Sequence, residues 1–161
     1  MDSCSSLATI DDAQFDLVVA NYVIMDTPDL HAAIKAFFRV LKPGGAAVLV
    51  FSHPCFPQGR ASSWGDGHQV SYQWDFPYFE PKKFVDLPWG HFRSNFIWFH
   101  RPLSDYWKAF RGAGFSIEEF EEPRVTEERY HLAPNEHMLH KSKTRPYSVA
   151  FKLRKNFENS S

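Results

Sequence analysis

The sequence predicts an α/β fold in which two buried parallel strands are joined by one helix. Phe15 to Val23 and Ala46 to His53 are nearly continuous apolar runs, which are typical of parallel strands covered on both faces. The segment between them has apolar residues at helical spacing, and Pro43-Gly44-Gly45 is expected to end that helix. Strand, helix and strand in this order form the βαβ unit of doubly wound sheets, which bind ligands at the carboxyl ends of their strands.

The predicted helix begins at Thr27-Pro28, because threonine is a good N-cap and proline is favourable at the first helical position. Asp29 adds a negative charge in the first turn, where the helix dipole favours it. The residues that form its apolar stripe are Leu30, Ala33, Ile34, Phe37, Phe38 and Leu41. The polar residues before Phe15 are expected to form a loop.

After the βαβ unit of residues 15–53, the chain changes in composition. Residues 54–99 are rich in proline, glycine, serine and aromatic rings, and they are predicted to form a lid over the strand ends. Val70 to Phe76 alternates strictly and Phe96 to Phe99 is strand-like, so an antiparallel hairpin or flap is expected within this segment. A second small core of packed rings is the alternative interpretation of the same aromatic residues.

Residues 100–155 are expected to complete the single domain. A second helix follows Pro102, and Phe115 to Phe120 is predicted to be a short strand. Glu121 to Lys143 is charged and interrupted by prolines, which indicates a loop. Tyr147 to Leu153 then alternates between apolar and polar residues, as in an antiparallel strand near a sheet edge with one buried face.

The composition excludes several function classes. The 161 residues suit one domain, and a net charge of −1 gives no general attraction to nucleic acid or a membrane surface. No apolar run approaches the roughly 20 residues of a membrane span. Cys4 and Cys55 form no CxxC pair and indicate reduced thiols, so we expect a cytoplasmic protein. The histidines of the C-terminal half match no zinc-binding spacing, and no metal site is predicted.

Several residues are candidates for chemistry. His53 ends the second predicted strand and could deprotonate a substrate, since the ordinary pKa of histidine lies near neutral pH; a histidine packed under the aromatic segment is the alternative. Arg101 could hold a substrate carboxylate, although a solvated arginine at a helix start fits as well. The rings that could stack on an apolar or aromatic small molecule are Tyr72, Trp74, Tyr78, Trp89 and Trp98.

The segment FDLVVANYVIMDTPDLHAAIKAFFRVLKPGGAAVLVFSHPCF resembles the central stretch of class I S-adenosylmethionine-dependent methyltransferases. His100 to Pro123 resembles the helix and strand that follow in small-molecule members, and RPYSVAFKLRK resembles their last, antiparallel strand. This resemblance implies an incomplete Rossmann-like methyltransferase fold, with the first three strands and the glycine-rich cofactor loop absent. It also implies S-adenosylmethionine as the cofactor, with Asn21, Tyr22 and Val23 lining its pocket.

The expected function is methyl transfer from S-adenosylmethionine to a small, apolar or aromatic acceptor, in the C-terminal half of a truncated methyltransferase. The alternative function, suggested by the missing glycine loop, is that of a non-catalytic half-domain that acts as a binding or dimerisation partner. A reductase is disfavoured, because the sequence has no G-x-G-x-x-G fingerprint. In the complete fold the strand matching Phe15 to Val23 is central, so its open edge here predicts a homodimer or another association.

Overall fold

The computed structural model describes residues 7–56, 61–64, 69–73, 76–88 and 93–157. Its main sheet has the strand order β1-β2-β8-β7, in which β1 and β2 are parallel and the other two pairs are antiparallel. The strands are β1 (Phe15–Asn21), β2 (Leu41–Ser52), β7 (Ser116–Glu121) and β8 (Ser148–Arg154). The predicted α/β class and the final antiparallel strand are therefore confirmed.

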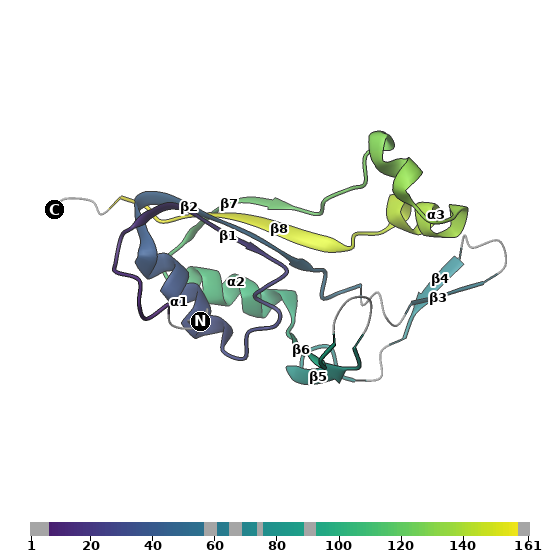
Figure 1. Ribbon diagram of the computed structural model, residues 1–161, viewed down its shortest axis with the longest axis horizontal. Helices are drawn as coiled ribbons and strands as arrows, with labels where there is room; N and C mark the ends of the chain where they lie inside the picture. Colours follow the sequence, from purple (N-terminus) through teal and green to yellow (C-terminus); the bar gives the residue numbers. More distant parts are fainter. Residues whose placement is uncertain (1–6, 57–60, 65–68, 74–75, 89–92, 158–161) are drawn as a thin grey trace.

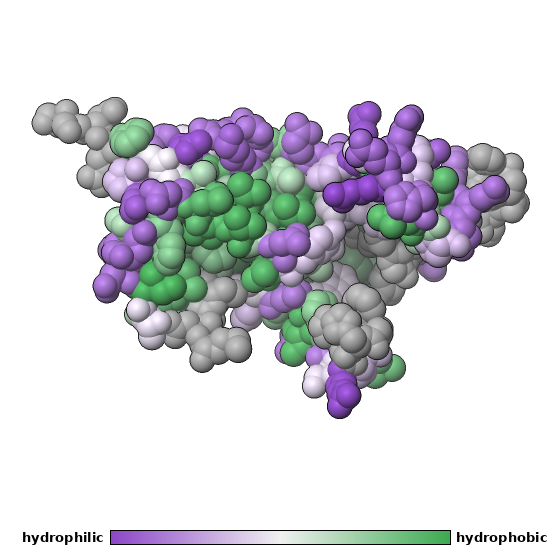
Figure 2. All heavy atoms as spheres, turned by 45° about the horizontal axis from the view of Figure 1, so that its top comes forward, coloured by the Kyte–Doolittle hydropathy of each residue, from purple (hydrophilic) through white to green (hydrophobic). Residues whose placement is uncertain are grey.

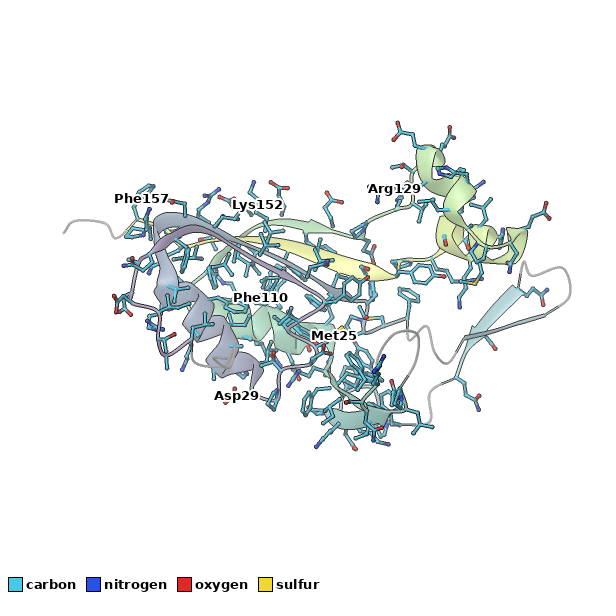
Figure 3. The ribbon with its side chains drawn as sticks, viewed as in Figure 1. Met25, Asp29, Phe110, Arg129, Lys152 and Phe157 are labelled. Carbon is cyan, nitrogen blue, oxygen red and sulfur yellow. The ribbon has the colours of Figure 1, made fainter. Side chains whose placement is uncertain are left out.

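Two helices, α1 (Leu30–Val40) and α2 (Leu103–Gly112), cover the same face of this sheet (Figure 1). Figure 3 shows Phe110 of α2 on this covered side and Lys152 of β8 on the other. The buried core lies between the two layers because strand residues at alternate positions point toward the helices. Its main members are Ile34, Phe37, Leu49, Phe51, Tyr106, Phe110, Val149, Phe151 and Leu153.

The opposite face of the sheet carries no helix in the part of the chain that the structure describes (Figure 1). Phe15, Leu17 and Val19 of β1 point to this face, with exposed fractions of 42%, 53% and 62%. β1 is also an edge strand of the sheet, so the open apolar edge expected from the sequence is present.

The first helix begins later and ends earlier than the sequence predicts. Asp29, rather than Thr27, is the N-cap, because its side chain accepts a hydrogen bond of 2.9 Å from the backbone N–H of Ala32. The hydroxyl of Thr27 instead donates to the carbonyl of Val23, at 3.2 Å. Leu41 is already extended and starts β2, and Gly44 within that strand has a φ of +79°, a conformation that favours glycine.

The prediction of a loop between Glu121 and Lys143 is wrong. This segment contains a 3-10 helix, Glu127–Leu132, and a helix α3, Glu136–Thr144. The side chain of Asn135 caps α3 by accepting a hydrogen bond of 2.9 Å from the N–H of Met138. No helix of the described residues is long and apolar enough to cross a membrane.

The aromatic segment forms two small antiparallel pairs. One consists of β3 (Ala61–Trp64) and β4 (Gln69–Tyr72), and the other of β5 (Lys82–Asp86) and β6 (Phe96–His100). Hairpin-like pairing was expected here, but the two strand-like stretches of the sequence belong to different pairs. Whether the segment acts as a lid stays a prediction.

Candidate functional site

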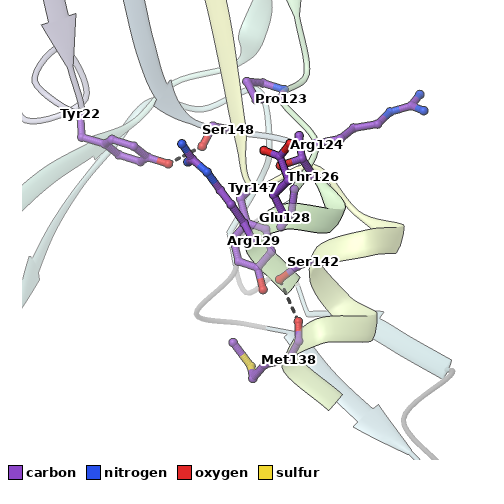
Figure 4. Close-up of a pocket in the computed structure, with 11 residues that line it drawn as sticks. Tyr22, Pro123, Arg124, Thr126, Glu128, Arg129, Met138, Ser142, Tyr147 and Ser148 are labelled. Atoms are coloured by element: carbon purple, nitrogen blue, oxygen red, sulfur yellow. Dashed lines mark hydrogen bonds between the residues drawn. The ribbon is translucent and has the colours of Figure 1, made fainter. Parts of the chain in front are cut away.

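A pocket of about 680 Å³ lies beyond the carboxyl end of β1 (Figure 4). Its walls come from the end of β1, the segment between β7 and α3, α3 itself and the start of β8. Open α/β sheets bind their ligands at this end of the strands. The lining residues are Tyr22, Pro123, Arg124, Val125, Thr126, Glu128, Arg129, Met138, Ser142, Tyr147 and Ser148.

Tyr22 connects the first strand to this pocket. Its backbone is left-handed, with a φ of 53°, and its N–H donates to the carbonyl of Val50 at 2.7 Å. Its hydroxyl shares a hydrogen bond with the Oγ of Ser148, so the side chain reaches from the end of β1 to the start of β8 (Figure 4). The neighbouring Asn21 and Val23 are exposed. The cofactor role of these three residues stays a prediction, and the structure brings at least Tyr22 to the pocket.

His53 is buried at the end of β2 and uses both ring nitrogens. Its Nδ1 accepts a hydrogen bond of 3.2 Å from the N–H of Cys55, and its Nε2 lies 2.7 Å from Oε1 of Glu122. Because Nδ1 is an acceptor, we assign the proton to Nε2, which then donates to the Glu122 carboxylate. The N–H of His53 also donates to the carbonyl of Tyr147 at 2.9 Å, which ties the residue to the start of β8.

Glu122 is the member of this pair that reaches solvent. The side chain of His53 is 3% exposed, whereas that of Glu122 is 48% exposed. Glu122 immediately precedes Pro123, which lines the pocket. Sequence reasoning missed Glu122 because it lies in a charged stretch 69 positions from His53, and no local motif joins the two.

Tyr78 and His100 hold the aromatic segment against the start of α2. The Tyr78 hydroxyl accepts a hydrogen bond of 3.1 Å from the N–H of Leu103 and lies 3.2 Å from the Sγ of Cys55. Burial, with a smaller contribution from Cys55, raises the pKa of Tyr78 to about 12, so this hydroxyl stays protonated at neutral pH. Burial lowers the pKa of His100, whose Nε2 lies 2.8 Å from the Tyr78 carbonyl.

Arg101 is buried rather than solvated, and its contacts are structural. Its Nη2 donates to the carbonyls of Thr27 and Pro28, at 2.6 and 2.9 Å, and its guanidinium lies 5.0 Å from the centroid of the Phe99 ring. These bonds anchor the loop between β1 and α1. The substrate role predicted for Arg101 stays a prediction, and its contacts favour a positioning role.

The other predicted acceptor-binding residues do not line this pocket where the structure describes them. Trp98 lies on β6, stacks on Phe84 with centroids 4.3 Å apart, and donates from Nε1 to Asp86 at 2.7 Å. Tyr72 ends β4. Trp74 and Trp89 lie outside the described residues. Their assignment to the acceptor stays a prediction.

Asp26, in the loop after β1, should make stability depend on pH. Its Oδ1 is buried and has no hydrogen-bond partner among the described residues, and burial raises the pKa of Asp26 to about 6. Because the pKa in the unfolded chain is about 3.9, the free energy of unfolding should fall as pH rises from about 4 to about 6. We expect Asp26→Asn to raise it by about 1 kcal/mol at pH 7, a value reduced for partial exposure.

Urea denaturation at several pH values measures this effect. Asp11→Asn, a change at an exposed aspartate in the preceding loop, is the matched control and should leave the pH dependence as it is. Identical pH profiles for the wild-type chain and Asp26→Asn would contradict the prediction.

Comparison with known proteins gives matches to methyltransferases. Residues 2–49 match a family model described as a methyltransferase domain. Demethylmenaquinone methyltransferase of Lactococcus lactis subsp. lactis is 48% identical over 44 residues, which are 27% of this chain and 18% of that protein. The protein of the same name from Staphylococcus carnosus is 37% identical over 70 residues, or 43% of this chain and 27% of that one. The matched region thus spans less than a third of either relative.

The fold is similar to that of solved methyltransferases over nearly the whole chain. The crystal structure of an S-adenosylmethionine dependent methyltransferase from Mesorhizobium loti has a TM-score of 0.72, with 20% sequence identity, and covers 95% of this chain and 67% of that one. Similarity at this level of identity concerns the fold. Together with the sequence matches, it confirms the resemblance to class I methyltransferases predicted above.

Proposed function

We propose that this chain, which contains part of a class I S-adenosylmethionine-dependent methyltransferase domain, forms the acceptor side of a methyltransferase active site. The proposed reaction is methyl transfer from S-adenosylmethionine to a small acceptor of apolar or aromatic character. The observation that carries the proposal is the pocket at the carboxyl end of β1, because Tyr22 in its wall belongs to the segment that resembles the family's cofactor-lining stretch.

The names of the curated relatives support an aromatic acceptor. Both relatives described above are demethylmenaquinone methyltransferases, and such quinones combine an aromatic bicyclic ring with an apolar chain. The rings of the aromatic segment, with Tyr78 and Trp98 among them, would suit an acceptor of this kind by stacking. In this proposal the segment moves toward the pocket, which requires the Tyr78 hydroxyl to give up its contacts with the N–H of Leu103 and the Sγ of Cys55.

Tyr22 lines the pocket and its neighbours Asn21 and Val23 do not, so the proposal places the sulfonium cofactor at the side of the pocket formed by Tyr22. Asn21, Tyr22 and Val23 would hold it, and the electron-rich ring of Tyr22 tolerates a nearby cation. When bound, S-adenosylmethionine supplies an activated methyl group, whose transfer breaks the carbon–sulfur bond and returns the electron pair to sulfur. The protein then has to align the acceptor and, where the acceptor is protonated, remove a proton.

Glu122 is the proposed proton acceptor. Its carboxylate is partly exposed, and one of its oxygens accepts the Nε2–H of His53. Glu122 does not itself line the pocket, but it directly precedes Pro123, which does. His53 cannot itself take a proton through Nε2 in this arrangement, since that nitrogen already carries one. We therefore propose that His53 is a positioning residue rather than the catalytic base expected from the sequence. It orients the Glu122 carboxylate, which accepts the acceptor's proton.

Calorimetric titration of the purified chain with S-adenosylmethionine tests the proposal first. We expect micromolar binding, a free energy of about −8 kcal/mol. Absence of heat up to millimolar ligand would contradict a cofactor site on this chain. That result would support the alternative, a non-catalytic half-domain that acts through a partner.

Turnover with a small hydroquinone then tests Glu122. We expect Glu122→Gln to lower kcat about 100-fold, because general bases contribute factors of this size, while the Kd for S-adenosylmethionine stays the same. Glu121→Gln is the matched control, since Glu121 is an exposed neighbour that does not line the pocket. Equal turnover of the two variants would remove Glu122 from the mechanism.

A further inference from the structure

We infer that the acceptor carries a carboxylate and that Arg129 binds this carboxylate in the candidate pocket. The inference rests on the proposed function, because a methyl acceptor is what the pocket is proposed to hold, and it adds the charge of that acceptor. Three observations support it. They are the direction in which Arg129 points, the lack of a partner for its guanidinium among the described residues, and the positive charge around it.

Arg129 belongs to the 3-10 helix Glu127–Leu132, which contributes to the wall of the pocket. Its N–H donates to the carbonyl of Thr126 at 2.9 Å. The ammonium group of Lys143 in α3 lies 4.0 Å from the centroid of the neighbouring Tyr130 ring, a distance at which a cation and a ring attract each other. These contacts hold the backbone of Arg129 in place relative to α3, which lines the same pocket.

The two arginines that line the pocket point in different directions (Figure 4). The Arg129 side chain points toward the hydrogen bond between Tyr22 and Ser148, at the carboxyl end of β1. The Arg124 side chain points away from the other lining residues. Arg129 is also exposed, so a ligand that enters from solvent can reach it. Of the two arginines, Arg129 therefore presents its guanidinium to a ligand in the pocket.

The guanidinium of Arg129 makes no ion pair or hydrogen bond within the part of the chain that the structure describes. By contrast, the guanidinium groups of Arg39 and Arg154 lie 2.6 and 2.8 Å from carboxylates. A guanidinium has five N–H donors in a planar fork, which matches the two oxygens of a carboxylate. The donors of Arg129 are thus available to a carboxylate that enters the pocket.

Further positive charge lies at the end of α3, next to the pocket. Burial, and to a smaller extent the charge of Arg145, lowers the pKa of Lys141. Nη1 of Arg145 and the hydroxyl of Tyr147, which lines the pocket, are buried and have no hydrogen-bond partner among the described residues. Figure 2 shows hydrophilic side chains gathered at the end of the molecule that carries α3. Neighbouring positive charges and unused donors favour an anionic ligand.

The lining of the pocket indicates the kind of anion. Two arginines and one glutamate line it, so its walls carry a net charge of +1. This charge suits a monoanion such as a carboxylate, which is ionised at neutral pH. Pro123, Val125 and Met138 supply apolar surface in the same lining, which suits an apolar or aromatic body. A small aromatic acid combines the two features.

Binding of 2-naphthoate and of its neutral amide, 2-naphthamide, to the full chain tests the inference. The two compounds share a bicyclic aromatic ring and nearly the same shape, and they differ in charge. Isothermal titration at low ionic strength, where screening is weak, should give the wild-type chain a Kd about 10-fold lower for 2-naphthoate, because only the carboxylate forms a charge-assisted pair. Arg129→Gln should bind the two compounds equally.

Arg124→Gln is the matched control, since Arg124 is also exposed and lines the pocket but points away from the other lining residues. This variant should keep the wild-type preference for 2-naphthoate. Circular dichroism verifies that both variants fold. A wild-type chain that binds the two compounds equally or binds neither, or a preference that survives Arg129→Gln, overturns the inference.

Titration of the same variants with S-adenosylmethionine identifies the source of the carboxylate, because the methionine part of this cofactor carries one too. We expect Arg129→Gln to bind the cofactor as the wild-type chain does. Weaker cofactor binding by Arg129→Gln would assign the arginine to the cofactor and overturn the inference. A wild-type chain that binds no cofactor contradicts the proposed function itself. Normal cofactor binding together with equal binding of the two naphthyl compounds contradicts only the charge of the acceptor.

Discussion

Replacement of Phe51 with alanine should lower the free energy of unfolding by about 4 kcal/mol. Phe51 has no exposed surface, and its ring stacks on Tyr106 with centroids 4.2 Å apart and on Phe151 at 6.0 Å. Truncation removes buried apolar surface and leaves a cavity that the two neighbouring rings cannot fill. Because ordinary domains have about 5–15 kcal/mol of stability, this single change should bring the chain close to unfolding. Urea denaturation measures the loss.

Phe79→Ala provides the control, since Phe79 is 80% exposed and its truncation should change the free energy of unfolding by less than about 0.5 kcal/mol. Equal effects of the two substitutions would contradict the core described here. Phe51→Ala should also disturb the candidate site, because Phe51 lies near the end of β2 and His53 follows that strand directly. The pairing of His53 with Glu122 depends on the position of that strand.

The elements that the sequence predicted well have a local signal. The run from Phe15 to Val23 and the run from Ala46 to His53 are apolar over their whole length, and only a buried strand suits such runs with a short helix between them. The predicted N-cap, Thr27, was wrong, because the structure has Asp29 in that position. The cap is set by the side chain that reaches the N–H of Ala32, and the sequence alone does not specify this contact.

The candidate site was only partly predictable because its contacts join distant parts of the chain. Tyr22 and Ser148 are 126 positions apart and share a hydrogen bond, and no pattern in the sequence indicates this pairing. Helix α3 contributes Met138 and Ser142 to the pocket, but its polar, proline-flanked sequence has too weak an apolar stripe to predict a helix. The sequence therefore predicted which residues lie near the strand ends, but it did not predict which distant polar residues contact them.

Arg101 is the residue whose interpretation changes most between sequence and structure. The residues alone allowed a substrate-binding or a solvated arginine, whereas the structure places it in contact with backbone carbonyls more than 70 positions away in the chain. A buried arginine with such partners stabilises the fold, because its removal leaves the Thr27 carbonyl without its donor.

Arg101→Ala should accordingly lower the free energy of unfolding by about 3 kcal/mol, the sum of lost charge-assisted hydrogen bonds and lost contact with Phe99. Arg124→Ala is the control: Arg124 lines the pocket and is exposed, so its loss should leave stability within about 0.5 kcal/mol of the wild type. Denaturation of the two variants separates the alternatives. If Arg101 binds the substrate, Arg101→Ala should weaken acceptor binding and leave the free energy of unfolding unchanged. If Arg101 is a positioning residue, Arg101→Ala should lower the free energy of unfolding. Arg101→Lys should then recover part of the loss, because a lysine can donate to one of the two carbonyls.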